Sequence, residues 1–149
     1  MVTMTVRIEG VPETTAMLDR LRRIVERMRP TMTSVGEYLL NVFSNQAFES
    51  EGAIYGLKWQ PLNPKYALWK STRYPGRGIL ERSGNLRRGF KAYPAESYLL
   101  IENKVPYAAK HQYGRGVPQR TIVAIQSRQK SEIERIIQND IMERFRQAL

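Results

Sequence analysis

The spacing of apolar residues predicts helices at both ends of this chain. Apolar side chains recur three and four positions apart over residues 17–28 and again over residues 35–48. Residues 129–149 repeat this pattern, so we expect a C-terminal amphipathic helix. Between these segments the helical period is lost, which indicates strands and loops in the middle of the chain.

The two N-terminal helical patterns are separated by Pro30, which ends or kinks a helix. Ser34, followed three residues later by Glu37, resembles a capping box and predicts that the second helix begins there. Its apolar stripe continues to about Glu49. Two antiparallel helices and one broken helix fit this pattern equally well.

Short alternating segments predict strands. Residues 3–9 alternate between apolar and polar side chains, as a half-buried strand does. Residues 86–93 and 97–103 flank a Pro94-Ala95-Glu96 turn and are expected to form a hairpin. Residues 107–112 can form one helical turn. The fold class predicted for the single domain, residues 1–149, is therefore α+β, with a small antiparallel sheet packed against the N-terminal helices and the C-terminal helix.

Residues 52–78 show no period and contain three prolines and four glycines. They also contain Trp59, Tyr66, Trp69 and Tyr74, and aromatic side chains at this density need a surface against which to be buried. Long loops in small domains are usually functional or disordered. We therefore interpret this segment as a long aromatic and basic loop that becomes ordered against a partner.

The net charge of +10 is concentrated in the middle of the chain. Residues 52–120 contain thirteen basic residues and only three acidic ones, Glu81, Glu96 and Glu102. Such a segment favours an anionic partner, either nucleic acid or an acidic protein surface. The alternative is a solvated basic face that aids solubility.

The sequence offers little catalytic chemistry. There is no cysteine, and His111 is the single histidine, so a His-rich metal site and a thiol nucleophile are excluded. A catalytic triad using His111 and a glutamate is not excluded, but a packed structural histidine is favoured. The pair Gly114 and Gly116 is too short for a dinucleotide fingerprint. We expect no enzymatic activity, no metal and no cofactor.

The middle segment fits two kinds of interaction. Its aromatic side chains can stack on bases while its cations contact phosphates, although no known nucleic-acid module is present. Alternatively, its tryptophans are hydrophobic anchors of a protein interface, which we favour. The interface candidates are Lys58, Trp59, Lys65, Tyr66, Trp69, Lys70, Arg73 and Arg77.

Several short motifs, in order, resemble those of the phage virion morphogenesis, or tail completion, family of Mu-like and related tailed phages. They extend from Trp59 to Val123, about half of the chain, and the run after Arg120 departs from the family's pattern. The motifs are Trp59-Gln60-Pro61-Leu62-Asn63-Pro64 with Tyr66, Ile79-Leu80, Ser83-Gly84-Asn85-Leu86, Tyr107-Ala108-Ala109, His111-Gln112-Tyr113-Gly114 and Pro118-Gln119-Arg120.

The resemblance implies a structural protein that acts at the end of the tail tube or at the head–tail joint. Such proteins assemble as rings, often hexameric, so we expect a homo-oligomer that contacts tail-tube or head-connector proteins, and basic side chains that meet acidic surfaces or DNA in the lumen. The positions that we expect to maintain the shape of the motifs are Gly84, Leu86, Tyr107, His111, Gly114, Pro118 and Arg120.

The predicted location is the virion, after assembly in the cytoplasm of the bacterial host. No apolar run approaches the roughly 18 residues that cross a bilayer, and no secretory signal is visible, so no contact with a membrane is expected. The remaining alternative, from a different functional class, is a small basic nucleic-acid-binding protein.

Overall fold

The computed structural model describes residues 11–149, which form the α+β structure predicted from the sequence. The strand predicted for residues 3–9 lies outside the described residues. The elements in chain order are α1 (Val11–Val25), α2 (Arg29–Asn41), η1 (Val42–Gln46), α3 (Ala47–Glu49), η2 (Ala53–Tyr55), α4 (Pro64–Arg73), α5 (Asn85–Arg88), β1 (Phe90–Pro94), β2 (Leu99–Asn103), α6 (Ala108–Tyr113) and α7 (Ser127–Gln147).

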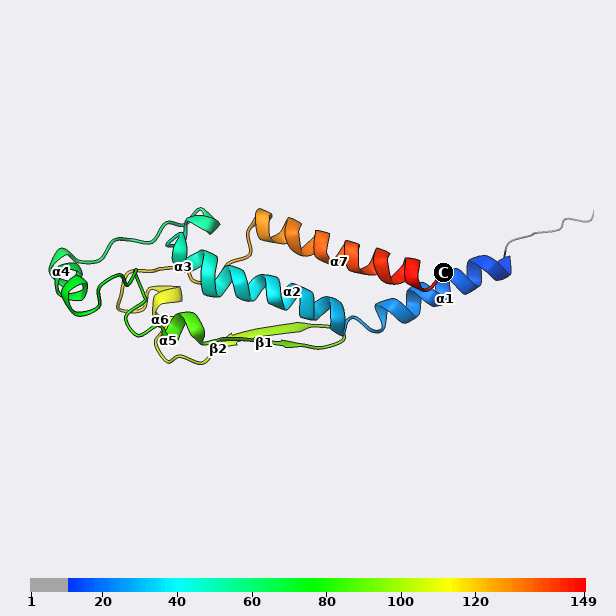
Figure 1. Cartoon of the computed structure of the whole chain (residues 1–149), viewed down its shortest axis with the longest axis horizontal. Coiled ribbons are helices and arrows are strands. Elements are labelled where there is room, and N and C mark those ends of the chain that lie inside the picture. The colour runs from blue at the N-terminus through cyan, green and yellow to red at the C-terminus, as the bar shows by residue number, and fades with distance from the viewer. Residues whose placement is uncertain (1–10) are drawn as a thin grey trace, which may run out of the picture.

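The described part of the molecule is elongated, with α2 at its centre (Figure 1). Helix α7 runs along one side of α2, and the β1–β2 hairpin covers the opposite side. Helix α4 lies at one end of the long axis and α1 at the other. Because α2 has neighbours on two sides, it supplies much of the apolar core.

Helices α1 and α2 form one broken helix, since they run in the same direction along the long axis (Figure 1). The antiparallel alternative is therefore wrong. The capping box predicted at Ser34 is also wrong: α2 begins five residues earlier, with Pro30 in its first turn, where a missing N–H costs nothing. From α7, Arg144 donates a hydrogen bond of 2.7 Å to the carbonyl of Arg27 and so supports the break.

The helical stripe predicted to reach Glu49 is confirmed, because α2 continues without interruption through η1 into α3. The five residues of η1 have π-helical geometry, which inserts an extra residue into the turn. Val42, Phe43, Ala47 and Phe48 remain buried across this change of period. The whole segment therefore presents a continuous apolar face to the core.

The predicted hairpin is present, but its first strand is shorter than expected. Strands β1 and β2 are antiparallel. In the turn that connects them, the N–H of Ala95 donates a hydrogen bond of 2.9 Å to the carbonyl of Tyr98. The assignment of strand to residues 86–88 is wrong, because α5 occupies them. Gly84 has a φ of 78°, which lets the chain turn into this short helix and bury Leu86.

A close approach between α2 and the hairpin depends on Gly36. A Cβ atom at this position would lie 3.3 Å from Leu99 Cδ1 and 3.4 Å from the Cβ of Ala92. The missing side chain thus allows α2 to pack closely against the hairpin. The buried apolar residues of the core that results are Val35, Leu39, Val42, Phe43, Ala47, Phe48, Tyr55, Trp59, Ile79, Leu86 and Ile122.

The interpretation of residues 52–78 as a loop without regular structure is wrong, because the segment contains η2 and α4. Helix α4 begins where the side chain of Asn63 accepts a hydrogen bond of 3.0 Å from the N–H of Lys65, and Pro64 occupies the first turn. An asparagine cap followed by proline is a standard helix start. The predicted helices at residues 107–112 and 129–149 are confirmed as α6 and α7.

Candidate functional site

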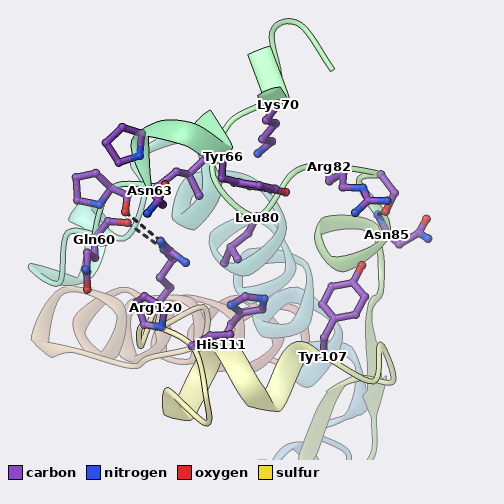
Figure 2. Close-up of a pocket in the computed structure, with 16 residues that line it drawn as sticks. Gln60, Asn63, Tyr66, Lys70, Leu80, Arg82, Asn85, Tyr107, His111 and Arg120 are labelled. Carbon is purple, nitrogen blue, oxygen red and sulfur yellow. Dashed lines mark hydrogen bonds between the residues drawn. The ribbon is translucent and has the colours of Figure 1, made fainter. Parts of the chain in front are cut away.

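An open groove with a volume of about 1180 Å³ lies between three segments that are distant in sequence. Its walls come from residues 60–66, 80–85 and 107–120, and Lys70 projects into it from α4 (Figure 2). Each of these three segments contains motifs noted in the sequence. The fold therefore brings separate motifs together around one concave surface.

The first wall is held in place by Trp59, which is 2% exposed. Its indole N–H donates a hydrogen bond of 2.8 Å to the carbonyl of Thr121, and its ring meets Phe48 edge to face at 5.4 Å. A buried tryptophan usually finds such a partner for its N–H. Trp59 thus fixes the chain just before residues 60–66 leave the core.

Arg120 connects the first wall to the third. Its Nε donates to the carbonyl of Gln60 at 3.0 Å, and an Nη donates to that of Pro61 at 3.3 Å (Figure 2). The residue is 5% exposed, and burial lowers the pKa of its guanidinium from the ordinary value. The two carbonyls accept hydrogen bonds from the guanidinium. Among the described residues, no carboxylate forms an ion pair with it.

The second wall contains a strained backbone. Leu80 has a φ of 62°, a conformation that is a genuine outlier for a bulky residue. Its side chain points into the groove, where Lys70, Tyr107 and His111 surround it (Figure 2). Strain of this kind costs about 1–3 kcal/mol and is concentrated at functional sites. The outlier therefore supports a functional role for this surface.

His111, on α6, faces the groove and lies beside Tyr107, with ring centroids 6.2 Å apart and nearly perpendicular planes. Its Nδ1 is buried, and no described residue forms a hydrogen bond with it. Burial, together with the charge of Arg120, lowers the pKa of His111 below its ordinary value. The imidazole is therefore neutral at neutral pH and has an unused polar atom.

The cation of Arg82 stands at the edge of the groove and is exposed. Its guanidinium carbon lies 5.9 Å from the ring centre of Trp69 and 5.6 Å from that of Tyr74. Cations over aromatic faces are attracted by the ring quadrupole. Arg82 therefore connects the groove to the aromatic surface of α4.

The structure divides the predicted interface candidates into two groups. Trp59 and Lys70 are buried, so the interpretation of Trp59 as a hydrophobic anchor of a protein interface is wrong for the subunit, in which it belongs to the core. Trp69 is 47% exposed and stacks at 5.6 Å on Tyr66, which is also exposed. The exposed cations of the segment are Lys58, Lys65, Arg73 and Arg77.

Lys58 is less available than the other exposed cations. Its ammonium forms an ion pair of 3.2 Å with Glu51 and donates to the carbonyl of Ser50. Lys70 is 3% exposed, and its Nζ donates to the carbonyl of Gly78, which fixes the chain before Leu80. Burial lowers the pKa of this ammonium from its ordinary value.

The motif residues lie in or near the groove. Tyr107, His111, Pro118 and Arg120 line it directly. Gly114 has a φ of 68° where α6 ends, and a Cβ atom there would lie 2.9 Å from that of Gln119. The two remaining positions, Gly84 and Leu86, start α5 and fill the core.

Sequence reasoning missed the roles of Leu80, Arg82 and Gln112. The side chain of Gln112 accepts hydrogen bonds from the N–H groups of Ile122 and Val123, at 2.8 and 3.0 Å, and fixes the segment after Arg120. The position of Gln112 inside the histidine-glutamine-aromatic-glycine motif was a usable signal. No sequence signal marks the strain at Leu80.

The groove combines cationic, polar and apolar side chains. Among the described residues, no group of three or more His, Cys, Asp or Glu side chains could hold a metal ion. No helix of the described part is long and apolar enough to cross a membrane. What the groove presents is a set of cations, an imidazole and apolar walls, which suit the binding of another molecule.

Comparison with known proteins identifies a family. The model of the phage virion morphogenesis family matches residues 11–143, nearly the whole chain. No curated protein and no solved structure matches.

Proposed function

Because the chain belongs to the phage virion morphogenesis family, we propose that it is a structural, non-enzymatic component of a phage particle that acts at tail completion or at the head–tail joint. The family supports a role in virion assembly. The observation that carries the finer proposal is the groove, in which motifs from three separate segments meet. A surface built from such motifs, without a reactive centre, is suited to fitting another protein.

We propose further that the protein acts as a subunit of a ring, with a hexamer as the expected stoichiometry. Helix α4 lies at one end of the molecule (Figure 1). Its side chains Tyr66, Leu68 and Trp69 are exposed. Aromatic side chains and arginine are enriched at protein interfaces, and exposed apolar groups in a cluster indicate a binding surface. This end is therefore the proposed contact with a neighbouring subunit or with a tail-tube or head-connector protein.

A second candidate function is direct binding of nucleic acid, favoured by the exposed cations Lys65, Arg73 and Arg77 around Trp69. The two functions differ in their dependence on salt. A protein that makes many phosphate contacts loses affinity steeply as salt increases and needs no phage partner. A structural ring protein binds its neighbouring virion protein, with DNA contact in the lumen as a secondary interaction.

The decisive experiment is deletion of the gene in a phage or inducible prophage that encodes it, followed by electron microscopy. We expect separate heads and tails, or tails of abnormal length, and no infectious particles. Immunogold labelling of wild-type particles, assembled in the host cytoplasm, should mark one end of the tail. Normal infectious particles from the deletion strain would refute the proposal.

A further inference from the structure

The groove concentrates positive charge that the described residues do not neutralise. Lys70, Arg82 and Arg120 all line it, and none forms an ion pair with a carboxylate of the described part of the chain. Glu81 attracts Lys70, but its carboxylate pairs with Arg87 at 2.8 Å. No acidic side chain is among the described residues that line the groove.

Two of these cations are buried, which is costly without a compensating anion. Lys70 and Arg120 are 3% and 5% exposed, and their hydrogen bonds go to backbone carbonyls. Buried charges are normally paired. An anionic group entering the groove would supply the missing partner.

His111 adds an unsatisfied polar atom to the same surface. Its Nδ1 is buried and has no hydrogen-bond partner among the described residues. Buried polar atoms without a partner are rare, and each requires an explanation. In Figure 2 the imidazole lies between Arg120 and Tyr107 and faces the cavity. The ring lines the groove, so a small rotation of this side chain on binding would present Nδ1 to a hydrogen-bonding ligand.

Apolar side chains form much of the remaining wall. They include Leu62, Leu80 and Pro118, with the ring of Tyr66 on one side. A ligand that fills the groove must therefore present apolar atoms next to its negative charge. A peptide with neighbouring acidic and apolar side chains has this chemistry, whereas protein surfaces that bind a nucleic-acid backbone are more polar than those that bind proteins.

We propose that the groove binds a peptide segment of a partner protein in which a carboxylate side chain stands next to a large apolar one. The carboxylate lies beside Arg82 at the edge of the groove, and the apolar side chain covers Leu80, which separates Arg82 from Arg120 (Figure 2). This inference rests on the proposed function, because it specifies the chemistry of the virion protein that docks here. Charge-assisted hydrogen bonds then fix the segment, and the apolar contacts exclude water.

The test uses the purified protein and a synthetic hexapeptide of alternating leucine and glutamate. His111 is the single histidine, so its ring gives one resolved set of NMR signals that reports on the groove. We expect a saturable shift of these signals. The matched leucine–glutamine peptide and the Arg82→Gln variant should each weaken binding by about tenfold, because each removes a charge-assisted contact. Arg128→Gln, an exposed arginine on α7, is the control that should leave binding unchanged.

Four results would overturn the inference: no saturable shift, equal binding of the glutamine peptide, unchanged affinity in a folded Arg82→Gln variant, or tighter binding of inorganic phosphate or a single-stranded oligonucleotide. Tighter binding of the oligonucleotide would assign the groove to nucleic acid. None of these measurements uses phage particles. If the peptide test fails while the deletion strain makes defective particles, only the proposed ligand of the groove is refuted. The proposed role in assembly then stands.

Discussion

Two glycines with the same backbone conformation have very different surroundings. Gly52 and Gly56 both have positive φ, 82° and 70°. A Cβ atom on Gly52 would lie 2.3 Å from the carbonyl oxygen of Leu57 and 2.5 Å from Trp59 Cδ1, whereas one on Gly56 would meet nothing within 4 Å. Gly52 is therefore required by space as well as by conformation, because it lies against the tryptophan that anchors the groove.

This difference gives a matched pair of variants. Gly56→Ala should lower the free energy of unfolding by about 1–2 kcal/mol, the cost of a left-handed conformation for a residue with a side chain. Gly52→Ala should cost roughly 1–3 kcal/mol more, because the core must also move to admit the methyl group. Urea denaturation measures both values. Equal costs would show that the contact with Trp59 is relaxed without penalty.

His111 gives a prediction about pH. Its pKa is lowered, so the folded protein favours the neutral imidazole and the unfolded chain binds the proton more readily. The contribution of His111 to stability is therefore complete above its ordinary pKa of 6.5 and is lost as the pH falls from 6.5 through the lower pKa of the folded state. NMR titration of the ring should give a midpoint below 6.5.

The control for this effect is His111→Gln, which should reduce the loss of stability between about pH 7 and pH 5 relative to the wild type. Carboxylates that titrate in the same range affect both proteins alike, so the difference isolates the imidazole. A ring midpoint at or above 6.5 would contradict the prediction.

At the scale of single residues, the sequence identified His111 and Arg120 through short motifs, but their meeting in one groove required the fold. The strain at Leu80 had no signal, since any leucine is normally expected at negative φ. Trp59 was misjudged for a physical reason. A tryptophan in an aperiodic segment looks exposed, although here the N–H finds a carbonyl 62 residues away at Thr121.

At the scale of elements, the two tryptophans have different surroundings: Trp59 lies in the core before α4, and Trp69 lies on the exposed face of α4. Trp59→Ala should destabilise the subunit by about 3–5 kcal/mol, because a buried aromatic side chain leaves a cavity. Trp69→Ala, on the exposed face of α4, removes ring contacts with Tyr66 and Tyr74 and should lower the free energy of unfolding by only about 1 kcal/mol, while reducing particle yield. Thermal unfolding and a plaque assay by complementation measure the two effects. A stable, folded Trp59→Ala protein would contradict the assignment of this residue to the core.

Periodicity predicted the long elements well and the short ones poorly. Helices α2 and α7 each have an apolar stripe long enough to show the helical period. Helix α4 has only ten residues, too few for a repeated stripe, and it lies at one end of the molecule (Figure 1). The start of the predicted first strand became α5, since the positive φ of Gly84 and the burial of Leu86 outweigh local strand preference.

At the scale of the whole molecule, the exposed charge and the apolar surface should have separable effects on assembly. Replacing Lys65, Arg73 and Arg77 together with glutamine should leave stability unchanged, since all three are exposed. Association with other virion proteins should become slower and less sensitive to salt, because surface charges mainly steer encounter. Particle yield measured over a range of salt concentrations tests this. Complete loss of particles at every salt concentration, with Trp69→Ala fully active, would instead favour direct contact with DNA.

The construction of the groove also has a consequence for the timing of assembly. Arg120 reaches across 60 positions to Gln60, and the chain that follows it is fixed by Gln112. A nascent chain on the ribosome therefore lacks the binding surface until Arg120 has been synthesised. Contacts between such distant positions also form late in folding, since loop closure must occur first. Under the proposed function, an unfinished or misfolded subunit would lack the groove that docks its partner, and it would therefore be excluded from the particle.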